Sequence, residues 1–307
     1  AIWLNVSIQL VKIPIDLLYL MSNCTSYMSF RDFLHTTEEW VDEEGLIGMK
    51  YAINQAWMGV LRRSSPLFRA GTNVYERSWD LLIILDACRA DAIEEVADEY
   101  SFLDNPGTMR SAASTSIEWM EKTFVDGYSD EIENTIYVTA NPHSSSVSEL
   151  PFVDFEDIYN YGWNDRISGI RAETVTDVSI NVGRKHHGEY GRMIVHYMQP
   201  HYPFIGPDAG GSLRTHSGFE KSRNEALGSE EKREQFNIWE MVGRGSVDLD
   251  HVRKAYNENL KIVIPHVKEI LEFVHGKTVI TSDHGNLLGE RPIPIPVRLY
   301  GHPERVP

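Results

Sequence analysis

The sequence predicts an α/β fold in which a mainly parallel central sheet is sandwiched by helices. Two observations support this prediction. Short, purely aliphatic runs such as Leu81–Leu85 are typical of strands that are buried on both faces. Segments with apolar residues at helical spacing lie between the strand-like runs. Strands that alternate with helices favour a parallel sheet with a helical layer on each face.

Four strands and the helices between them follow this alternation. The predicted strands are Leu81–Leu85, Thr135–Thr139, Met193–Tyr197 and Thr278–Thr281, and the predicted helices cover residues 89–100, 171–185 and 249–275. A polar segment rich in Gly, Ser, Arg and Glu, at 206–245, is interpreted as an excursion from the sheet that contains one short helix.

The character of the chain changes near Trp79. Residues 31–63 carry apolar side chains at helical spacing, and the Ser-Ser-Pro sequence at 64–66 then breaks the pattern. We therefore expect a mostly helical N-terminal extension over residues 1–78 and an α/β domain over residues 79–307. The sequence leaves open whether this domain continues beyond residue 307.

Composition limits the classes of function. The chain has 307 residues, with 45 acidic and 29 basic side chains and a formal net charge of −16. A hydrophobic fraction of 42% is enough for a sizeable core and excludes a mainly disordered chain. The negative balance argues against nonspecific binding to nucleic acid or to an anionic membrane, because both need a basic surface.

The sequence has neither an apolar run of roughly 18 residues nor a signal peptide, so we expect no transmembrane segment and a cytoplasmic protein. Its two cysteines, Cys24 and Cys88, are too few for a disulfide framework or a cysteine-rich zinc site, and they fit a reducing compartment. Nothing in the sequence addresses the oligomeric state.

Carboxylate and imidazole side chains follow three of the predicted strands, at the edge where the ligand site of a parallel sheet lies. Asp86 comes directly after the first strand, His201 follows the third, and Asp283 and His284 follow the fourth. Such oxygen and nitrogen donors suit a divalent cation such as Zn, Mn, Mg or Ca, and a cation also offsets the repulsion between carboxylates. The sequence therefore predicts one or two divalent metal ions per chain.

A hydroxyl-rich turn, Ser111–Ser116, precedes a helix-like stretch and is the candidate source of a nucleophile. Thr115 with Glu118 three residues later matches a capping box, so one interpretation is purely structural. The functional interpretation uses the same geometry, because a helix N-terminus stabilises an anion and a metal ion lowers the pKa of a bound hydroxyl. The pattern alone does not choose between Ser114, Thr115 and Ser116.

The order and spacing of four motifs resemble the alkaline phosphatase/sulfatase superfamily, and most closely its archaeal sulfatase-like branch. The motifs are Leu85–Asp91, the hydroxyl-rich turn, His196–His201, and Thr281–Gly285 followed by Gly301-His302-Pro303. The resemblance extends from about Trp79 to His302 and leaves the N-terminal extension uncovered.

This resemblance implies roles for individual residues. Asp86, Asp283 and His284 correspond to metal ligands of the superfamily. Its nucleophile commonly stands two residues before a proline, which Ile117 replaces here. Thr115 therefore falls in the nucleophile slot, where it would also bind the metal.

Four further positions complete the predicted site and its surroundings. His302 matches a downstream histidine that completes the other site in two-metal members, and His201 matches a histidine that contacts the ester oxygens in sulfatase-like members. Arg89 is a candidate for binding the anionic ester, and an ion pair with Asp91 explains it equally well. His196 lies inside a predicted strand and is expected to point into the packing of the sheet.

The sequence predicts a metal-dependent hydrolase or transferase that acts on phosphate esters, an anionic substrate, through a Thr or Ser nucleophile. True sulfatases carry Cys (or Ser)-x-Pro-Ser-Arg, which becomes formylglycine, and that motif is absent here. Because Ala87 follows Asp86 where many sulfatases have paired aspartates, the metal count stays open at one or two.

Three alternatives to this function also stay open. One is a sulfatase that works without formylglycine. Another is a transferase of phosphoglycerol- or phosphoethanolamine-type groups onto surface glycans. The third is a metal-binding protein without catalysis.

Overall fold

The computed structural model divides into two compact units, Ala1–Pro66 and Leu67–Pro307. It describes residues 30–64, 71–103, 106–207, 238–290 and 298–301. Within these ranges, every helix is either too short or too polar to span a lipid bilayer.

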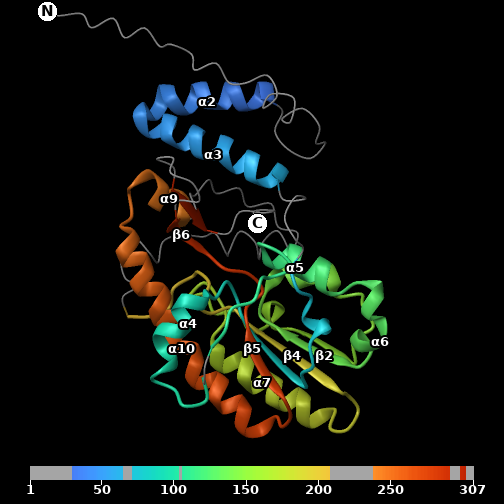
Figure 1. The fold of residues 1–307 in the computed structure, drawn as a ribbon. Coiled ribbons are helices and arrows are strands. Elements are labelled where there is room, and N and C mark those ends of the chain that lie inside the picture. Colours follow the sequence, from blue (N-terminus) through green and yellow to red (C-terminus); the bar gives the residue numbers. More distant parts are fainter. Residues whose placement is uncertain (1–29, 65–70, 104–105, 208–237, 291–297, 302–307) are drawn as a thin grey trace, which may run out of the picture. The chain divides into compact units, whose positions relative to one another are not determined.

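In the first unit, the described residues 30–64 form helices α2 (Phe30–Glu44) and α3 (Leu46–Ser64) (Figure 1). The sequence predicted a continuous helical stretch over 31–63, but the chain breaks it at Gly45. This glycine has φ +59°, a left-handed conformation that residues with a Cβ adopt only at a cost, and it therefore ends α2 and allows α3 to begin in a new direction.

The second unit is built on a five-stranded sheet in the order β3-β2-β4-β1-β5, with every neighbouring pair parallel. The strands are β1 (Leu81–Leu85), β2 (Thr135–Thr139), β3 (Asp154–Asp157), β4 (Arg192–Tyr197) and β5 (Thr278–Thr281). The predicted α/β class with a mainly parallel sheet is confirmed. The four predicted strands correspond to β1, β2, β4 and β5, and their bounds agree to within one residue.

Two further sheet features were not predicted. The edge strand β3 has the sequence Asp-Phe-Glu-Asp and is only half-buried, so it lacks the aliphatic run that marks a central strand. Strands β6 (Leu287–Glu290) and β7 (Leu299–Gly301) form a separate antiparallel pair after β5.

Helices cover both faces of the parallel sheet (Figure 1). In chain order they are α4 (Ala90–Ala97), α5 (Ser116–Thr123), α6 (Ser129–Ile132), α7 (Ala172–Lys185), α9 (Ile238–Arg244) and α10 (Leu249–Phe273), with short 3-10 turns η2 (Val74–Glu76), η3 (Asp126–Tyr128), η4 (Pro142–Val147) and η5 (Ile158–Asn160). The predicted helices agree with α4, α7 and α10, except that α4 ends three residues earlier than predicted.

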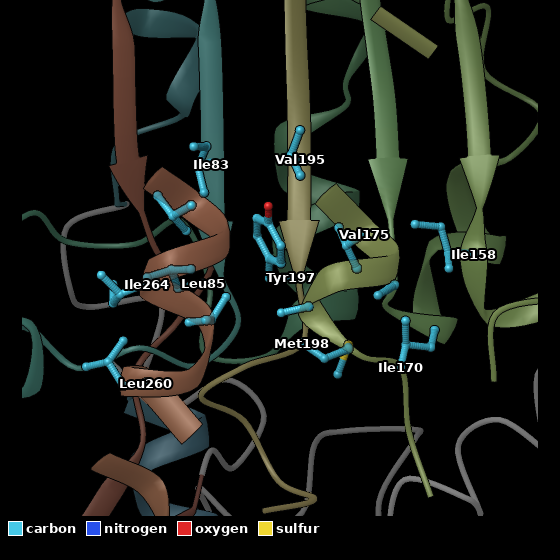
Figure 2. Close-up of a cluster of buried hydrophobic side chains, with 14 of the residues drawn as sticks. Ile83, Leu85, Ile158, Ile170, Val175, Val195, Tyr197, Met198, Leu260 and Ile264 are labelled. Carbon is cyan, nitrogen blue, oxygen red and sulfur yellow. The ribbon is translucent and has the colours of Figure 1, made fainter. Parts of the chain in front are cut away.

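One face of the sheet packs against α7 and α10. Figure 2 shows part of this core, in which side chains of β1 and β4 meet Leu260 and Ile264 of α10 and Val175 of α7. All three are fully buried, and complete burial of such a side chain contributes about 1.5–3 kcal/mol. The carboxyl ends of the strands are thereby anchored to two long helices.

The opposite face packs against α5, α6 and η4. Trp119 of α5 is buried here, and Tyr75 and Trp79, from the segment just before β1, belong to the same cluster. This segment belongs to the second compact unit, and the domain boundary at residue 79 stays a prediction. The functional side chains described next arise on this face.

Candidate metal centre

Strand alternation brings two polar side chains to the α5 side of the sheet. In β1, Leu85 belongs to the α10 core and Ile84 to the α5 core, so Asp86 emerges on the α5 side just beyond the strand. His196 of β4 is the register partner of Ile84, and Val195 beside it belongs to the α10 core, so the imidazole also lies on the α5 side. The two side chains therefore converge from neighbouring strands.

Asp86, His196 and Asp283 form a buried cluster of potential metal ligands. One ligand atom from each residue lies within 4.8 Å of the other two, and all three residues are at most 1% exposed. Among the described residues, Asp86 Oδ1, His196 Nε2 and Asp283 Oδ2 have no hydrogen-bond partner, although buried polar atoms are normally paired. A divalent cation accepts these oxygen and nitrogen donors, so the residues fit the metal predicted from the sequence.

His284 approaches the same carboxylates. Its Nε2 lies 3.6 Å from Asp86 Oδ1 and 3.6 Å from Asp283 Oδ2, and its ring is buried. Its Nδ1 lies 3.0 Å from the carbonyl oxygen of Gly285, which can only accept a hydrogen bond. Nδ1 therefore donates a proton there and leaves Nε2 to face the carboxylates, as a metal-binding histidine requires.

His196 was expected to serve only the packing of the sheet, and this expectation is incomplete. Its Nε2 lies 3.6 Å from Asp86 Oδ2 and 3.7 Å from Asp283 Oδ2. Its Nδ1 lies 3.0 Å from the hydroxyl of Tyr137, and burial raises the pKa of this phenol well above its ordinary value, which keeps it neutral. The Trp119 ring contacts the His196 ring in an edge-to-face arrangement with 6.0 Å between centroids. The imidazole of His196 is therefore fixed by Tyr137, by Trp119 and by the two carboxylates.

Each of the two carboxylates is oriented by hydrogen bonds that its second oxygen, Asp283 Oδ1 or Asp86 Oδ2, accepts. Asp283 Oδ1 accepts from the backbone N–H groups of Ala87, at 3.0 Å, and His284, at 2.9 Å. Asp86 Oδ2 accepts from the side-chain amide of Asn141, at 2.7 Å. Asn141 lies two residues after the end of β2, so the loop that follows this strand also contributes a side chain to the site.

The electrostatics at Asp86 favour its ionised form. Complete burial alone would raise its pKa, but the neighbouring imidazoles of His201, His196 and His284 outweigh burial and lower the pKa below its ordinary value. A carboxylate that stays ionised while buried is suited to bind a cation.

The hydroxyl groups of Ser114, Thr115 and Ser116 make different contacts, some with α5 and some with the buried cluster. Thr115 is the N-cap of α5, and its Oγ1 accepts from the backbone N–H of Glu118 at 3.4 Å. Ser114 donates to the Glu118 carboxylate at 3.2 Å. Ser116, the first residue of the helix, places its Oγ 3.3 Å from Asp86 Oδ2 and 3.3 Å from His284 Nε2. Of these three, Ser116 carries the hydroxyl that contacts the cluster.

Arg89, a candidate for ester binding, is engaged in ion pairs. Its guanidinium forms a two-pronged contact with Asp91, at 2.8 and 2.6 Å, and a further contact with Glu290 at 2.6 Å. It also donates to the backbone carbonyl of Asn286. Hydrogen bonding to Asp91 is the main reason that the pKa of Arg89 is raised above its ordinary value. The structural interpretation of Arg89 therefore accounts for its geometry.

His201 lies beside the cluster, and its ring centroid is 6.4 Å from that of His284. Its Nδ1 contacts the carbonyl oxygen of Tyr202. His302, predicted to complete a second metal site, lies outside the described residues.

No family model and no curated protein matches the chain. A solved structure that is similar to it is that of a protein in the alkaline phosphatase superfamily from Vibrio parahaemolyticus, with 11% identity, a TM-score of 0.37, and coverage of 82% of this chain and 70% of that one. The sequence motifs resemble the same superfamily. A likeness at this level carries no argument about function, so the proposals below rest on the site itself.

Proposed function

We propose that the chain is a metal-dependent enzyme that hydrolyses or transfers phosphate esters with Ser116 as its nucleophile. The observation that carries this proposal is the position of Ser116 Oγ, 3.3 Å from both Asp86 Oδ2 and His284 Nε2 in a buried ligand cluster. A lone serine at a helix start is usually a cap, but here Thr115 provides the cap.

The proposed metal ligands are Asp86, Asp283 and His284, with His196 beside them. A divalent cation held there would act as a Lewis acid, lowering the pKa of the serine hydroxyl and offsetting charge on the phosphoryl oxygens. Asp283 is oriented for this role because its Oδ1 is held by two backbone N–H groups while Oδ2 faces the cluster.

Ser116 performs the chemical step in this proposal. Its Oγ gives its proton to a water molecule and forms a bond to phosphorus, the ester P–O bond breaks, and the departing alkoxide takes up a proton from water and leaves as the alcohol. The N-terminus of α5, where Ser116 is the first helical residue, favours negative charge at Oγ. Water then releases inorganic phosphate from phosphoserine, or an acceptor alcohol takes the group and forms a new ester. His201 is proposed to contact the non-bridging oxygens.

A pair of single-hydroxyl variants tests the nucleophile. Ser116→Ala is expected to lower kcat at least about a thousandfold, whereas Thr115→Val, which removes the neighbouring hydroxyl, is expected to keep kcat within about tenfold. Mass spectrometry of protein quenched during turnover should find phosphate on Ser116. Undiminished turnover by Ser116→Ala would contradict the proposal.

Three aryl esters identify the substrate class: a phosphate monoester, a phosphate diester and a sulfate, each assayed after reconstitution with Mn²⁺ or Zn²⁺. Cleavage of a phosphate ester that disappears in Asp283→Ala supports the proposal. Cleavage of the sulfate alone supports a sulfatase that works without formylglycine. Metal binding with no cleavage of any ester supports a transferase that needs its acceptor, or a non-catalytic protein.

A further inference from the structure

Helix α10 carries two buried polar side chains, Tyr256 and Asn259, on a helix face that is otherwise apolar. They are three residues apart and so lie on one side of the helix, and both are 0% exposed. Burying polar groups is costly unless each finds a hydrogen-bond partner. The partners of both side chains are backbone groups of the two loops that carry Asp86 and His201.

Tyr256 holds the turn that follows β1. Its hydroxyl donates to the carbonyl oxygen of Ala87 at 2.9 Å and accepts from the backbone N–H of Arg89 at 2.8 Å. Ala87 has φ +56°, a left-handed conformation that costs a residue with a Cβ on the order of 1 kcal/mol or more, so surrounding contacts must maintain it. The same turn delivers Asp86 to the cluster and gives the Ala87 N–H to Asp283.

Asn259 holds the loop that follows β4. Its Oδ1 accepts from the backbone N–H of Ile205 at 2.8 Å, and its Nδ2 lies 3.1 Å from the carbonyl oxygen of His201 and 3.0 Å from that of Pro203. One side chain thus binds the backbone at three points of the loop. This loop presents the His201 imidazole beside His284.

We propose that Tyr256 and Asn259 are positioning residues through which α10 sets the two halves of the site independently. Tyr256 acts through the Asp86 turn and therefore on metal binding. Asn259 acts through the His201 loop and therefore on binding of the phosphoryl group. The second assignment rests on the proposed function, whereas the first requires only that the cluster binds a metal ion.

The test measures two affinities on the full chain. Mn²⁺ binding is followed by isothermal titration, and binding of inorganic phosphate by its inhibition of aryl phosphate hydrolysis and by titration of the Mn²⁺-loaded protein. Tyr256→Phe removes only the hydroxyl and is expected to weaken Mn²⁺ binding about tenfold or more, as losses of groups that orient metal ligands do. Asn259→Leu is expected to leave Mn²⁺ affinity within about twofold while weakening phosphate binding about tenfold.

Val263→Ala is the matched control, because Val263 is also fully buried on α10 and its side chain is purely apolar. It should lower the melting temperature without changing either affinity. If Asn259→Leu does not fold, Asn259→Ser, which is smaller and keeps a donor, replaces it with the same expected direction.

The split between the two affinities decides the inference. Variants that lose both affinities by the same factor, or that change neither more than Val263→Ala does, overturn it. Wild-type protein that binds Mn²⁺ and phosphate but neither cleaves an ester nor transfers its phosphoryl group to an added alcohol overturns the proposed function and leaves the positioning result standing. Wild-type protein that binds no Mn²⁺ overturns both.

Discussion

Replacement of Asp283 by asparagine separates the charge of this side chain from its shape. An asparagine oxygen can still accept the hydrogen bonds that Asp283 Oδ1 receives from Ala87 and His284. The amide nitrogen would take the place of Oδ2, the oxygen that faces Asp86 and has no hydrogen-bond partner. Asp283→Asn therefore removes one negative charge and one metal ligand from the cluster while keeping the backbone contacts.

The expected changes in stability have opposite signs with and without metal. At the 4.8 Å that bounds the cluster, two ionised carboxylates repel by about 3.5 kcal/mol at an effective dielectric constant of about 20. The adjacent imidazoles offset part of this repulsion, so we expect metal-free Asp283→Asn to be about 1 kcal/mol more stable than the wild type. A metal at 100 times its dissociation constant stabilises the wild type by about 2.7 kcal/mol.

Thermal unfolding with and without Mn²⁺ or Zn²⁺ measures both terms. In a unit of this size, 1 kcal/mol corresponds to about 2–4 °C, so the metal should raise the wild-type melting temperature by about 5–10 °C. Without metal, Asp283→Asn should have a slightly higher melting temperature than the wild type, and the metal should raise that temperature by almost nothing. Asp157→Asn, which changes a carboxylate outside the cluster, should keep the full metal shift. An equal metal shift in Asp283→Asn and the wild type would refute Asp283 as a ligand.

Three further predictions concern single side chains. Thr115→Val should lower stability by about 1 kcal/mol in denaturant unfolding, because it removes the cap of α5. Asn286 is 3% exposed, and neither atom of its side-chain amide has a hydrogen-bond partner in the part of the chain that the structure describes. Asn286→Leu should therefore raise the melting temperature of the metal-free protein by a few degrees; a fall would show that the amide stabilises the fold. Burial raises the pKa of Asp157 from 3.8 to about 6, so the folded state binds this proton more tightly than the unfolded state. The resulting stability is complete below pH 3.8 and is lost as pH rises through about 6. The free energy of unfolding of Asp157→Asn should therefore rise relative to that of the wild type between pH 4 and pH 7, by no more than about 1 kcal/mol for this partly exposed group. A difference in stability that stays constant over this pH range would contradict the raised pKa of Asp157.

The central strands could be predicted from the sequence because their burial on both faces leaves a compositional mark. The run Leu81–Leu85 needs no partner information to be recognised, since only a strand covered on both sides is aliphatic at every position. Strand β3 carries no such mark, because it is half-buried and three of its four residues are acidic, whereas the other edge strand, β5, keeps an apolar Val-Ile centre. Its place in the sheet depends on pairing with β2, which is a tertiary contact.

The carboxyl-edge rule identified Asp86, Asp283 and His284 as neighbours, and the structure brings them together. The same rule missed His196, because it considers only residues beyond the strand ends. Alternation within the strand supplies the missing signal. Once β4 is paired with β1, Ile84 and His196 stand side by side, and Asp86 is two residues further along on the same face. That register depends on pairing between strands that are more than 100 residues apart, so it could not be read from either segment alone.

The proposed nucleophile, Ser116, differs by one residue from the predicted Thr115, and local geometry is the reason for the change. Counting back from Ile117 gave Thr115, whereas the capping-box pattern already assigned Thr115 to the helix. A side chain that folds back to accept from the backbone N–H of Glu118 is directed along the first helical turn and away from the neighbouring strands. The next residue, Ser116, has helical backbone geometry and projects sideways, here toward Asp86. A nucleophile and an N-cap are therefore competing roles for one side chain, and because Thr115 serves as the cap we propose the following hydroxyl, that of Ser116, as the nucleophile.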